Sequence, residues 1–252
     1  MKGDMLEIAV QAAKSAGEYL QTASNDIIRV LAEPKRDIKL EADFKSEKII
    51  LSYLAHHSDF PILSEESGST NVQHPDSDNR YCWIVDPLDG SFNFSRGSDM
   101  CCVSIGLWES NKPLMGVIYN FRHDNLYTGI VGEGAWLNGK LISVNKNISL
   151  EKAVYSTGLP VSSDFSQNAL EKFGAELGQY GKIRMIGSAA LSLAYVACGI
   201  FDIYQERNIK IWDVAAGLAI VKAAGGEISF SGYPESNIIH AYGSAQLVQI
   251  DY

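Results

Sequence analysis

An apolar, strand-like run that ends in two aspartates constrains the fold of this chain most. Residues 83–94 read WIVDPLDGSFNF, so Asp86 and Asp89 follow the apolar run with Pro87 between them. The proline fixes a turn, so Asp86 leaves the strand while Asp89 points back from the turn. A protein core has no use for two carboxylates at the end of a buried strand. The pattern therefore predicts that both face one cation.

The residues that follow the second aspartate predict an anion site beside the cation. Gly90 lets the backbone approach a ligand closely. Ser91 is expected to cap a short helix that SFNF begins, and the amides of Gly90 and Ser91 would bind phosphate at the start of that helix. A metal next to a phosphate can direct an activated water onto phosphorus.

Further carboxylates stand at the ends of expected elements. They are Asp43 in EADFKSE, Glu65 and Glu66 in LSEESG, and Asp213 in IWDVAAG. Taken singly, each is explained by a turn, a solvated loop or a helix cap. Their joint presence favours a metal site, and a set of oxygen ligands without nitrogen or sulfur suits Mg²⁺ or Mn²⁺ better than zinc.

Composition excludes several classes of partner. The chain has 252 residues and a formal net charge of −9, with no run of lysine and arginine, so nucleic acid is a poor candidate. No apolar stretch is long enough to span a bilayer, and no signal peptide is evident at the N-terminus. The four cysteines lack the spacing of a zinc site and indicate free thiols. We expect a cytoplasmic protein.

The order of patterns predicts an α+β fold. Helical spacing of apolar residues covers 5–23 and 43–58, with a loop or short hairpin over 33–43. Short strands follow from 81 to 144, and strands alternate with helices from 151 onward. We expect two halves in one compact unit, 1–142 with most metal ligands, and 143–252 with the last ligand and the substrate contacts.

Several motifs resemble those of the inositol monophosphatase superfamily. WIVDPLDGSFNF is similar to its signature D-P-[IL]-D-G-[ST]-x-N-F, and IWDVAAGLAIVKAAGG to its second signature. SEES, GEGAWLNGK and DIKLEAD match further segments in family order, over nearly the whole chain. The resemblance implies a layered α-β-α-β-α sandwich of the sugar phosphatase type, with mixed, mainly antiparallel sheets. The chain departs from the family pattern at Leu40 and Ser91, where threonine is usual.

The resemblance also implies roles for single residues. Two or three Mg²⁺ ions, with Mn²⁺ as a substitute, would be held by Glu65, Asp86, the carbonyl of Leu88, Asp89, Ser91 and Asp213. Glu65 and Ser91 would activate the attacking water, with Asp43 supporting Ser91. Gly90 and Ser91 would bind the phosphate. Attack would be direct, without a covalent intermediate.

Substrate contacts are implied at a second set of positions. Glu206 would accept hydrogen bonds from polyol hydroxyls, beside the segment Gly187, Ser188 and Ala189. An exposed strand end is the alternative interpretation of Glu206. A second phosphate would instead need Arg184, Arg207 or Lys210 to reach the pocket.

The resemblance implies a Mg²⁺-dependent phosphoric monoester hydrolase that acts on inositol monophosphate or a similar small polyol phosphate. The alternatives are a fructose-1,6-bisphosphatase, a 3′(2′),5′-bisphosphate nucleotidase, or a non-catalytic regulatory member of the fold. Inhibition by lithium and a homodimer are implied as well. The expected partner is a small-molecule phosphate ester, not nucleic acid or a membrane.

Overall fold

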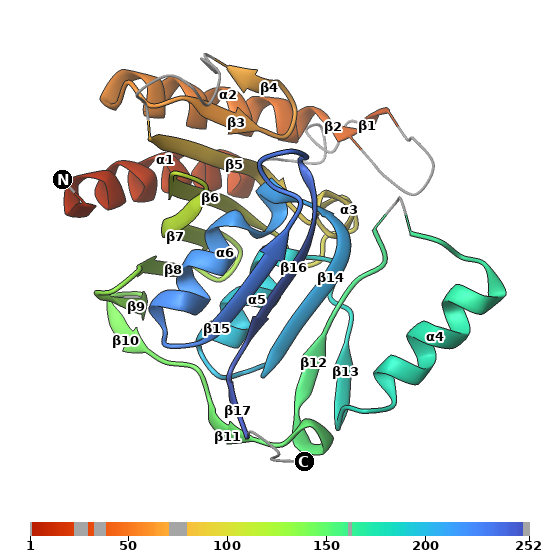
Figure 1. Cartoon of the computed structure of the whole chain (residues 1–252). Coiled ribbons are helices and arrows are strands. Elements are labelled where there is room, and N and C mark those ends of the chain that lie inside the picture. Colours follow the sequence, from red (N-terminus) through yellow and green to blue (C-terminus); the bar gives the residue numbers. More distant parts are fainter. Residues whose placement is uncertain (1, 23–29, 33–38, 71–79, 161–162, 249–252) are drawn as a thin grey trace.

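Strands between residues 62 and 142 form the larger of the two main sheets (Figure 1). The computed structural model describes residues 2–22, 30–32, 39–70, 80–160 and 163–248. The strands of the large sheet are β3 (Ile62–Ser64), β4 (Gly68–Thr70), β5 (Tyr81–Asp89), β6 (Cys102–Glu109), β7 (Lys112–Asn120), β8 (Asn125–Ile130), β9 (Gly134–Leu137) and β10 (Lys140–Ile142). Their order is β10-β9-β8-β7-β6-β5-β3-β4. Only β3 and β5 pair in parallel among them.

The smaller sheet is built from strands between residues 154 and 244. They are β12 (Val154–Ser156), β13 (Lys182–Arg184), β14 (Ile203–Lys210), β15 (Glu227–Ser231) and β16 (Ile238–Ser244), in the order β13-β12-β14-β16-β15. β12 pairs in parallel with both of its neighbours, whereas the other two pairs are antiparallel. Two short pairs complete the strands: β1 (Val30–Ala32) with β2 (Lys39–Leu40), and β11 (Lys146–Ile148) with β17 (Gln246–Leu247).

Helices cover both faces of the large sheet. The helices of the described residues are α1 (Lys2–Thr22), α2 (Glu41–His57), α3 (Ser91–Ser95), α4 (Gln167–Leu177), α5 (Ala189–Ala197) and α6 (Ile211–Ala223), with a 3₁₀ turn at Leu150–Lys152. α1 and α2 pack on each other and on one face, where α1 contacts β6 and β7 and α2 contacts β5. α5 and α6 fill the space between the two sheets, since α6 contacts β5–β8 on one side and β14–β16 on the other.

The layers follow from the composition of these helices. α5 and α6 are apolar nearly all round and bury most of their residues, as expected for helices enclosed by two sheets. α4 lies outermost, beyond β12 and β13 (Figure 1), where Leu177 packs against the small cluster of Ala153, Tyr155 and Ile203. The layered α-β-α-β-α sandwich predicted from the sequence is confirmed. Within the described residues, no helix is long and apolar enough to cross a membrane.

The structure differs from the sequence prediction at several elements. The hairpin of β15 and β16 and the parallel pairing of β11 with β17 were not predicted. The hairpin expected over 33–43 falls partly outside the described residues, and α2 already begins at Glu41. The division at 142/143 stays a prediction, although the strands of the large sheet end at Ile142 and those of the small sheet begin at Val154.

Candidate active site at the junction of the two sheets

Three carboxylates from distant parts of the chain meet at one point. Oxygens of Glu65, Asp86 and Asp213 all lie within 4.8 Å of one another. Glu65 lies in the turn between β3 and β4, Asp86 in the buried end of β5, and Asp213 in the first turn of α6. β3 and β5 run in parallel with Ser64 opposite Val85, so the chain after β3 emerges beside Asp86.

The packing of α6 brings the third carboxylate to this point. α6 crosses β5, β6 and β7, and Lys210 immediately precedes its first residue as N-cap. Asp213 is the third helical residue, and its Oδ2 accepts a hydrogen bond from the backbone amide of Lys210 at 3.1 Å. Asp213 is thus both a helix-terminal acceptor and a member of the cluster.

The electrostatics of the cluster favour a cation. Burial raises the pKa of Asp86 well above its ordinary value, and the charges of Glu65, Asp89 and Asp213 raise it further. Burial and the charges of Glu65, Asp89 and Glu206 likewise raise the pKa of Asp213 well above its ordinary value. Carboxylates that destabilise one another in this way fit a divalent cation, which prefers oxygen ligands and removes the repulsion.

Asp89 lines the same cavity as Glu65, Asp86 and Asp213, and residues at the start of α5 hold it in place. Its Oδ2 accepts hydrogen bonds from the hydroxyl of Ser188 at 2.5 Å and from the backbone amide of Ala190 at 2.9 Å. Ser188 also caps α5, since its hydroxyl oxygen accepts from the amide of Leu191. Burial raises the pKa of Asp89 to about 6, and the bonds from Ser188 and Ala190 oppose the rise. Ser188 therefore contacts Asp89 as well as lining the cavity.

The segment around Asp89 differs from the sequence prediction in two respects. β5 continues to Asp89 with its pairing to β6 shifted between Asp86 and Asp89, so Pro87 lies in an irregular part of the strand and not in a turn. Gly90, not Ser91, is the N-cap of α3, and it has the left-handed backbone conformation, with φ of +85°. A Cβ there would lie 2.6 Å from the carbonyl oxygen of Met100, so only glycine fits. Ser91 is the first helical residue, and its hydroxyl is directed to Asp43 instead of capping the helix.

Ser91 and Asp43 form a hydrogen-bonded pair behind the cavity. The Ser91 hydroxyl lies 2.6 Å from Asp43 Oδ1 and 2.9 Å from the carbonyl oxygen of Leu88. Asp43 Oδ2 accepts from the amide of Leu40 at 2.6 Å, so the backbone of Leu40 supplies support that does not depend on a threonine side chain. Burial raises the pKa of Asp43 to about 6, against the lowering effect of the Ser91 and Leu40 bonds.

Glu206 lines the same cavity as the carboxylate cluster, and it is buried, with 8% of its surface exposed. The hydroxyl of Tyr204 donates to Glu206 Oε2 at 3.0 Å. Burial raises the pKa of Glu206 to about 7, which exceeds the lowering effect of the Tyr204 bond. The interpretation of Glu206 as an exposed strand end is therefore wrong.

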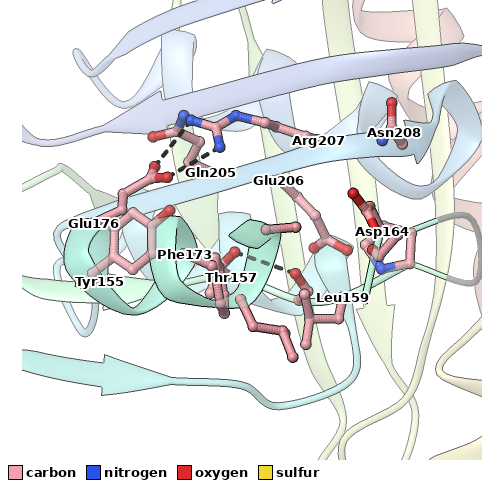
Figure 2. Close-up of a pocket in the computed structure, with 15 residues that line it drawn as sticks. Tyr155, Thr157, Leu159, Asp164, Phe173, Glu176, Gln205, Glu206, Arg207 and Asn208 are labelled. Atoms are coloured by element: carbon pink, nitrogen blue, oxygen red, sulfur yellow. Dashed lines mark hydrogen bonds and ion pairs between the residues drawn. The ribbon is translucent and has the colours of Figure 1, made fainter. Parts of the chain in front are cut away.

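A smaller cavity of about 180 Å³ shares Glu206 with the cavity of the carboxylate cluster (Figure 2). It lies between β14 and α4, and Glu206 and the segment 157–160 line both cavities. Figure 2 shows Arg207 directed away from Glu206 toward Glu176. The two guanidinium nitrogens of Arg207 lie 3.0 and 3.2 Å from the carboxylate oxygens of Glu176.

One cavity of about 780 Å³ brings the predicted site residues together. All of them except Asp43 line it, namely Glu65, Asp86, Leu88, Asp89, Gly90, Ser91, Gly187, Ser188, Ala189, Glu206 and Asp213. Asp43 reaches the cavity through Ser91. Of the cations proposed for a second phosphate, Lys210 lines this cavity, whereas Arg207 lines the smaller one. The Arg184 guanidinium donates to the carbonyl oxygen of Ile183.

Two supporting residues were missed in the sequence. The side-chain amide nitrogen of Asn93, Nδ2, donates to the carbonyl oxygens of Met100 and Ile186, both at 2.8 Å. It thereby ties α3 to the segment before α5. The buried hydroxyl of Ser46 donates at 2.7 Å to the carbonyl oxygen of Pro87, inside the irregular part of β5 between Asp86 and Asp89. The signal for Ser46 was its position one helical turn after Asp43 on a buried helix face.

Comparison with known proteins places nearly the whole chain in one family. Residues 1–232 match the Inositol monophosphatase family. The chain is 38% identical over 232 residues to a protein of Xylella fastidiosa named Nus factor SuhB, covering 90% of this chain and 82% of the relative. It is 39% identical over 229 residues to Inositol monophosphatase 3 of Solanum lycopersicum, covering 88% and 84%. The solved structure of an inositol monophosphatase from Anabaena (Nostoc) sp. superposes with a TM-score of 0.81 at 33% identity, covering 97% of this chain and 91% of that one.

Proposed function

The chain belongs to the inositol monophosphatase family, and we propose that it hydrolyses inositol monophosphate or a similar small polyol phosphate in a Mg²⁺-dependent reaction. The observation that carries the proposal is a single cavity that joins three chemical features. It contains the cluster of Glu65, Asp86 and Asp213, the turn at Gly90 and Ser91, and the buried acceptor Glu206.

The cluster supplies the ligands that a divalent cation prefers. Glu65, Asp86 and Asp213 would hold Mg²⁺ together with the carbonyl of Leu88, the Ser91 hydroxyl and Asp89. Because Asp89 Oδ2 already accepts bonds from α5, we expect Oδ1 to face the cation. When bound, Mg²⁺ would stabilise negative charge on the phosphate and the leaving oxygen and lower the pKa of a bound water.

The remaining steps belong to the residues of the chain. The single proton of Ser91 is donated to Asp43 or to the Leu88 carbonyl, so the lone pairs of the hydroxyl can accept a hydrogen bond from the attacking water. Glu65 would accept the water's other proton. The amides of Gly90 and Ser91 would hold the phosphate oxygens while the water attacks phosphorus directly and the bond between phosphorus and the ester oxygen breaks. The polyol would leave as an alkoxide that takes a proton from solvent water.

The wall formed by Glu206 favours a neutral polyol over a second phosphate. A carboxylate in this position accepts hydrogen bonds from hydroxyl groups and repels an anion. The nearest arginine on the same strand, Arg207, is already paired with Glu176 (Figure 2). Lys39, which also lines the cavity, contacts Glu66 at 2.5 Å.

Activity on a bisphosphate and a non-catalytic role are the two other outcomes that the same test can give. Lys210 lines the cavity and could bind the second phosphate of fructose 1,6-bisphosphate or a nucleoside 3′,5′-bisphosphate. A non-catalytic regulatory role is a second candidate, because one of the relatives is named a Nus factor.

Phosphate release from a substrate panel tests the proposal. The panel contains inositol 1-phosphate, fructose 1,6-bisphosphate, 3′-phosphoadenosine 5′-phosphate and glycerol 2-phosphate, each with Mg²⁺ and with EDTA. We expect metal-dependent release led by inositol 1-phosphate, and inhibition by Li⁺. Asp213→Asn is the control, since it removes a cluster carboxylate and keeps an acceptor for the Lys210 amide. Faster release from a bisphosphate would reassign the substrate, and no release from any substrate would favour the regulatory role.

A further inference from the structure

A buried glutamate on α2 holds the turn that carries Glu65. Glu47 is 6% exposed, and one of its carboxylate oxygens, Oε1, accepts four hydrogen bonds. The donors are the hydroxyl of Ser64 at 2.5 Å, the amide of Glu66 at 3.1 Å, and the amide and hydroxyl of Ser67 at 3.1 and 3.2 Å. These donors flank Glu65 on both sides.

We propose that Glu47 is a positioning residue that fixes the backbone of residues 64–67 and so holds the Glu65 carboxylate in the metal cluster. Glu65 follows β3 directly and lies in a turn instead of a strand. Fixing the residues before and after it leaves little freedom for its own position. Two of the four donors are the backbone amides of Glu66 and Ser67, so the bonds hold the backbone of the turn directly.

Charge repulsion within the cluster favours movement of Glu65 away from the other carboxylates, and Glu47 opposes that movement. Like charges on Glu65, Asp86 and Asp213 repel one another at distances within 4.8 Å. A turn with no buried anchor would relieve the repulsion by moving Glu65 away from the other two. The four bonds to Glu47 resist that movement before any cation binds, so the ligands are preorganised.

Glu47 acts through the turn and not as a ligand. It does not line the cavity that contains the cluster. It lines instead a groove between α2 and the segment 58–62, with Lys48, Ser52 and Phe60. Glu47 therefore acts on Glu65 through the flanking residues of the turn, whose two amides and two hydroxyls it accepts.

The same helix positions two other parts of the site. Asp43 contacts Ser91, and Ser46, three residues later, contacts the carbonyl of Pro87. Glu47 follows at the next position on the same buried face. One helix thus sets the relative positions of the 64–67 turn, the irregular end of β5 between Asp86 and Asp89, and the start of α3.

The inference rests on the proposed metal site, and direct titration of the full chain with Mn²⁺ separates the two. The titration, followed by the electron paramagnetic resonance of free Mn²⁺, compares wild type, Glu47→Ala, Glu47→Gln and Ile50→Ala. Ile50 is a fully buried residue on the same helix, so its truncation weakens the packing of α2 and leaves the four bonds in place.

We expect Glu47→Ala to weaken Mn²⁺ binding about 10- to 100-fold, the range typical of residues that orient metal ligands. Glu47→Gln keeps a neutral acceptor and should weaken binding less, and Ile50→Ala should change it less than twofold. In the phosphatase assay, Glu47→Gln should raise the Mg²⁺ concentration for half-maximal rate and leave KM for substrate at saturating Mg²⁺ unchanged.

Three results would overturn the inference. Binding within twofold of wild type in both Glu47 variants would show that the turn needs no anchor. Equal losses in Ile50→Ala and Glu47→Ala would show a general effect of weakening α2. If Glu47→Ala does not fold, as judged by circular dichroism, Mn²⁺ binding by Glu47→Gln within twofold of wild type is by itself the result that overturns the inference. A wild-type chain that binds no Mn²⁺ would overturn the metal site itself and the inference with it.

Discussion

Glu206 combines burial, a hydrogen bond and a negative surrounding field in one side chain. Burial raises its pKa from 4.5 to about 7, the Tyr204 bond lowers it, and the charge of Asp89 raises it. Because the pKa in the folded chain exceeds the unfolded value, the folded state favours the protonated form. The stability that Glu206 contributes is complete below about pH 4.5 and is lost as the pH rises through about 7.

Glu206→Gln should therefore change the pH dependence of stability. Glutamine keeps an acceptor for Tyr204 but cannot ionise, so its free energy of unfolding relative to wild type should rise between pH 5 and pH 9, by at most about 3 kcal/mol. Urea unfolding of both proteins in EDTA measures the difference, since the other carboxylates are common to both. Parallel pH profiles would show that Glu206 ionises in the folded chain at no cost.

The motifs predicted which residues meet at the site better than they predicted what supports them. Asp86, Asp89 and Asp213 stand at element ends where a sequence pattern can locate them. Glu47 could not be found in this way, because its partners lie in a turn 17 to 20 residues later in the chain. The local pattern assigned the Ser91 hydroxyl to a helix cap, whereas the family resemblance implied its actual partner, Asp43, which lies 48 residues away.

Helix α6 approaches the large sheet closely over three glycines. A Cβ on Gly106 would lie 3.0 Å from the amide nitrogen of Ala216, and one on Gly129 would lie 2.9 Å from the Cα of Ile220. A Cβ on Gly116 would collide with the carbonyl oxygen of Ala216. The missing side chains let the helix backbone lie directly on the strands, which sets the height of Asp213 above Asp86.

Gly116→Ala should displace α6 and weaken both stability and metal binding. We expect a loss of about 1–3 kcal/mol or more in the free energy of unfolding, the usual range for overpacking, together with weaker Mn²⁺ binding. Gly174→Ala in α4 is the matched control, because a Cβ there meets nothing within 4 Å and alanine is the better helix former. Unfolding in urea and Mn²⁺ titration measure the two effects. A Gly116→Ala protein as stable as wild type would show that α6 can shift without cost.

Elements with local patterns were predicted, and those that depend on distant partners were not. The spacing of apolar residues located α1 and α2, and helices were expected among the strands from 151 onward, where α4, α5 and α6 lie. The pairing of β11 with β17 joins Lys146 to Gln246, 100 positions apart, and no local pattern fixes such a partner. The hairpin of β15 and β16 was missed although apolar and polar residues alternate along β15, which reads EISFS.

The site lies where the two sheets and the helices between them converge. Glu65 and Asp86 come from the large sheet and its turn, Glu206 from the small sheet, and Asp213 from the helix between them. A cation bound here would link segments that are far apart in the sequence. Metal binding should therefore stabilise the whole fold and not one loop.

This linkage predicts that Mg²⁺ stabilises the chain more at high pH than at low pH. The raised pKa values of Asp86 and Asp213, and that of Asp89 at about 6, mean that the metal-free fold loses stability as the pH rises and these carboxylates ionise. A cation competes with protons for the same oxygens and removes their repulsion, so its effect should grow over the same pH range. A concentration of 100 times Kd would add about 2.7 kcal/mol, or roughly 5–10 °C in Tm for a chain of this size.

Thermal unfolding at pH 5.5 and pH 8, with Mg²⁺ or with EDTA, measures the effect, and Asp86→Asn serves as control. Asparagine can still accept the hydrogen bond that Asp86 Oδ1 receives from the Leu88 amide at 3.0 Å, but it carries no charge. In EDTA at pH 8 we expect Asp86→Asn to melt above wild type, because a buried charge and its repulsion are gone. The same variant should no longer gain stability from Mg²⁺. An equal Mg²⁺ effect at both pH values, or one that persists in Asp86→Asn, would place the cation somewhere other than on this carboxylate cluster.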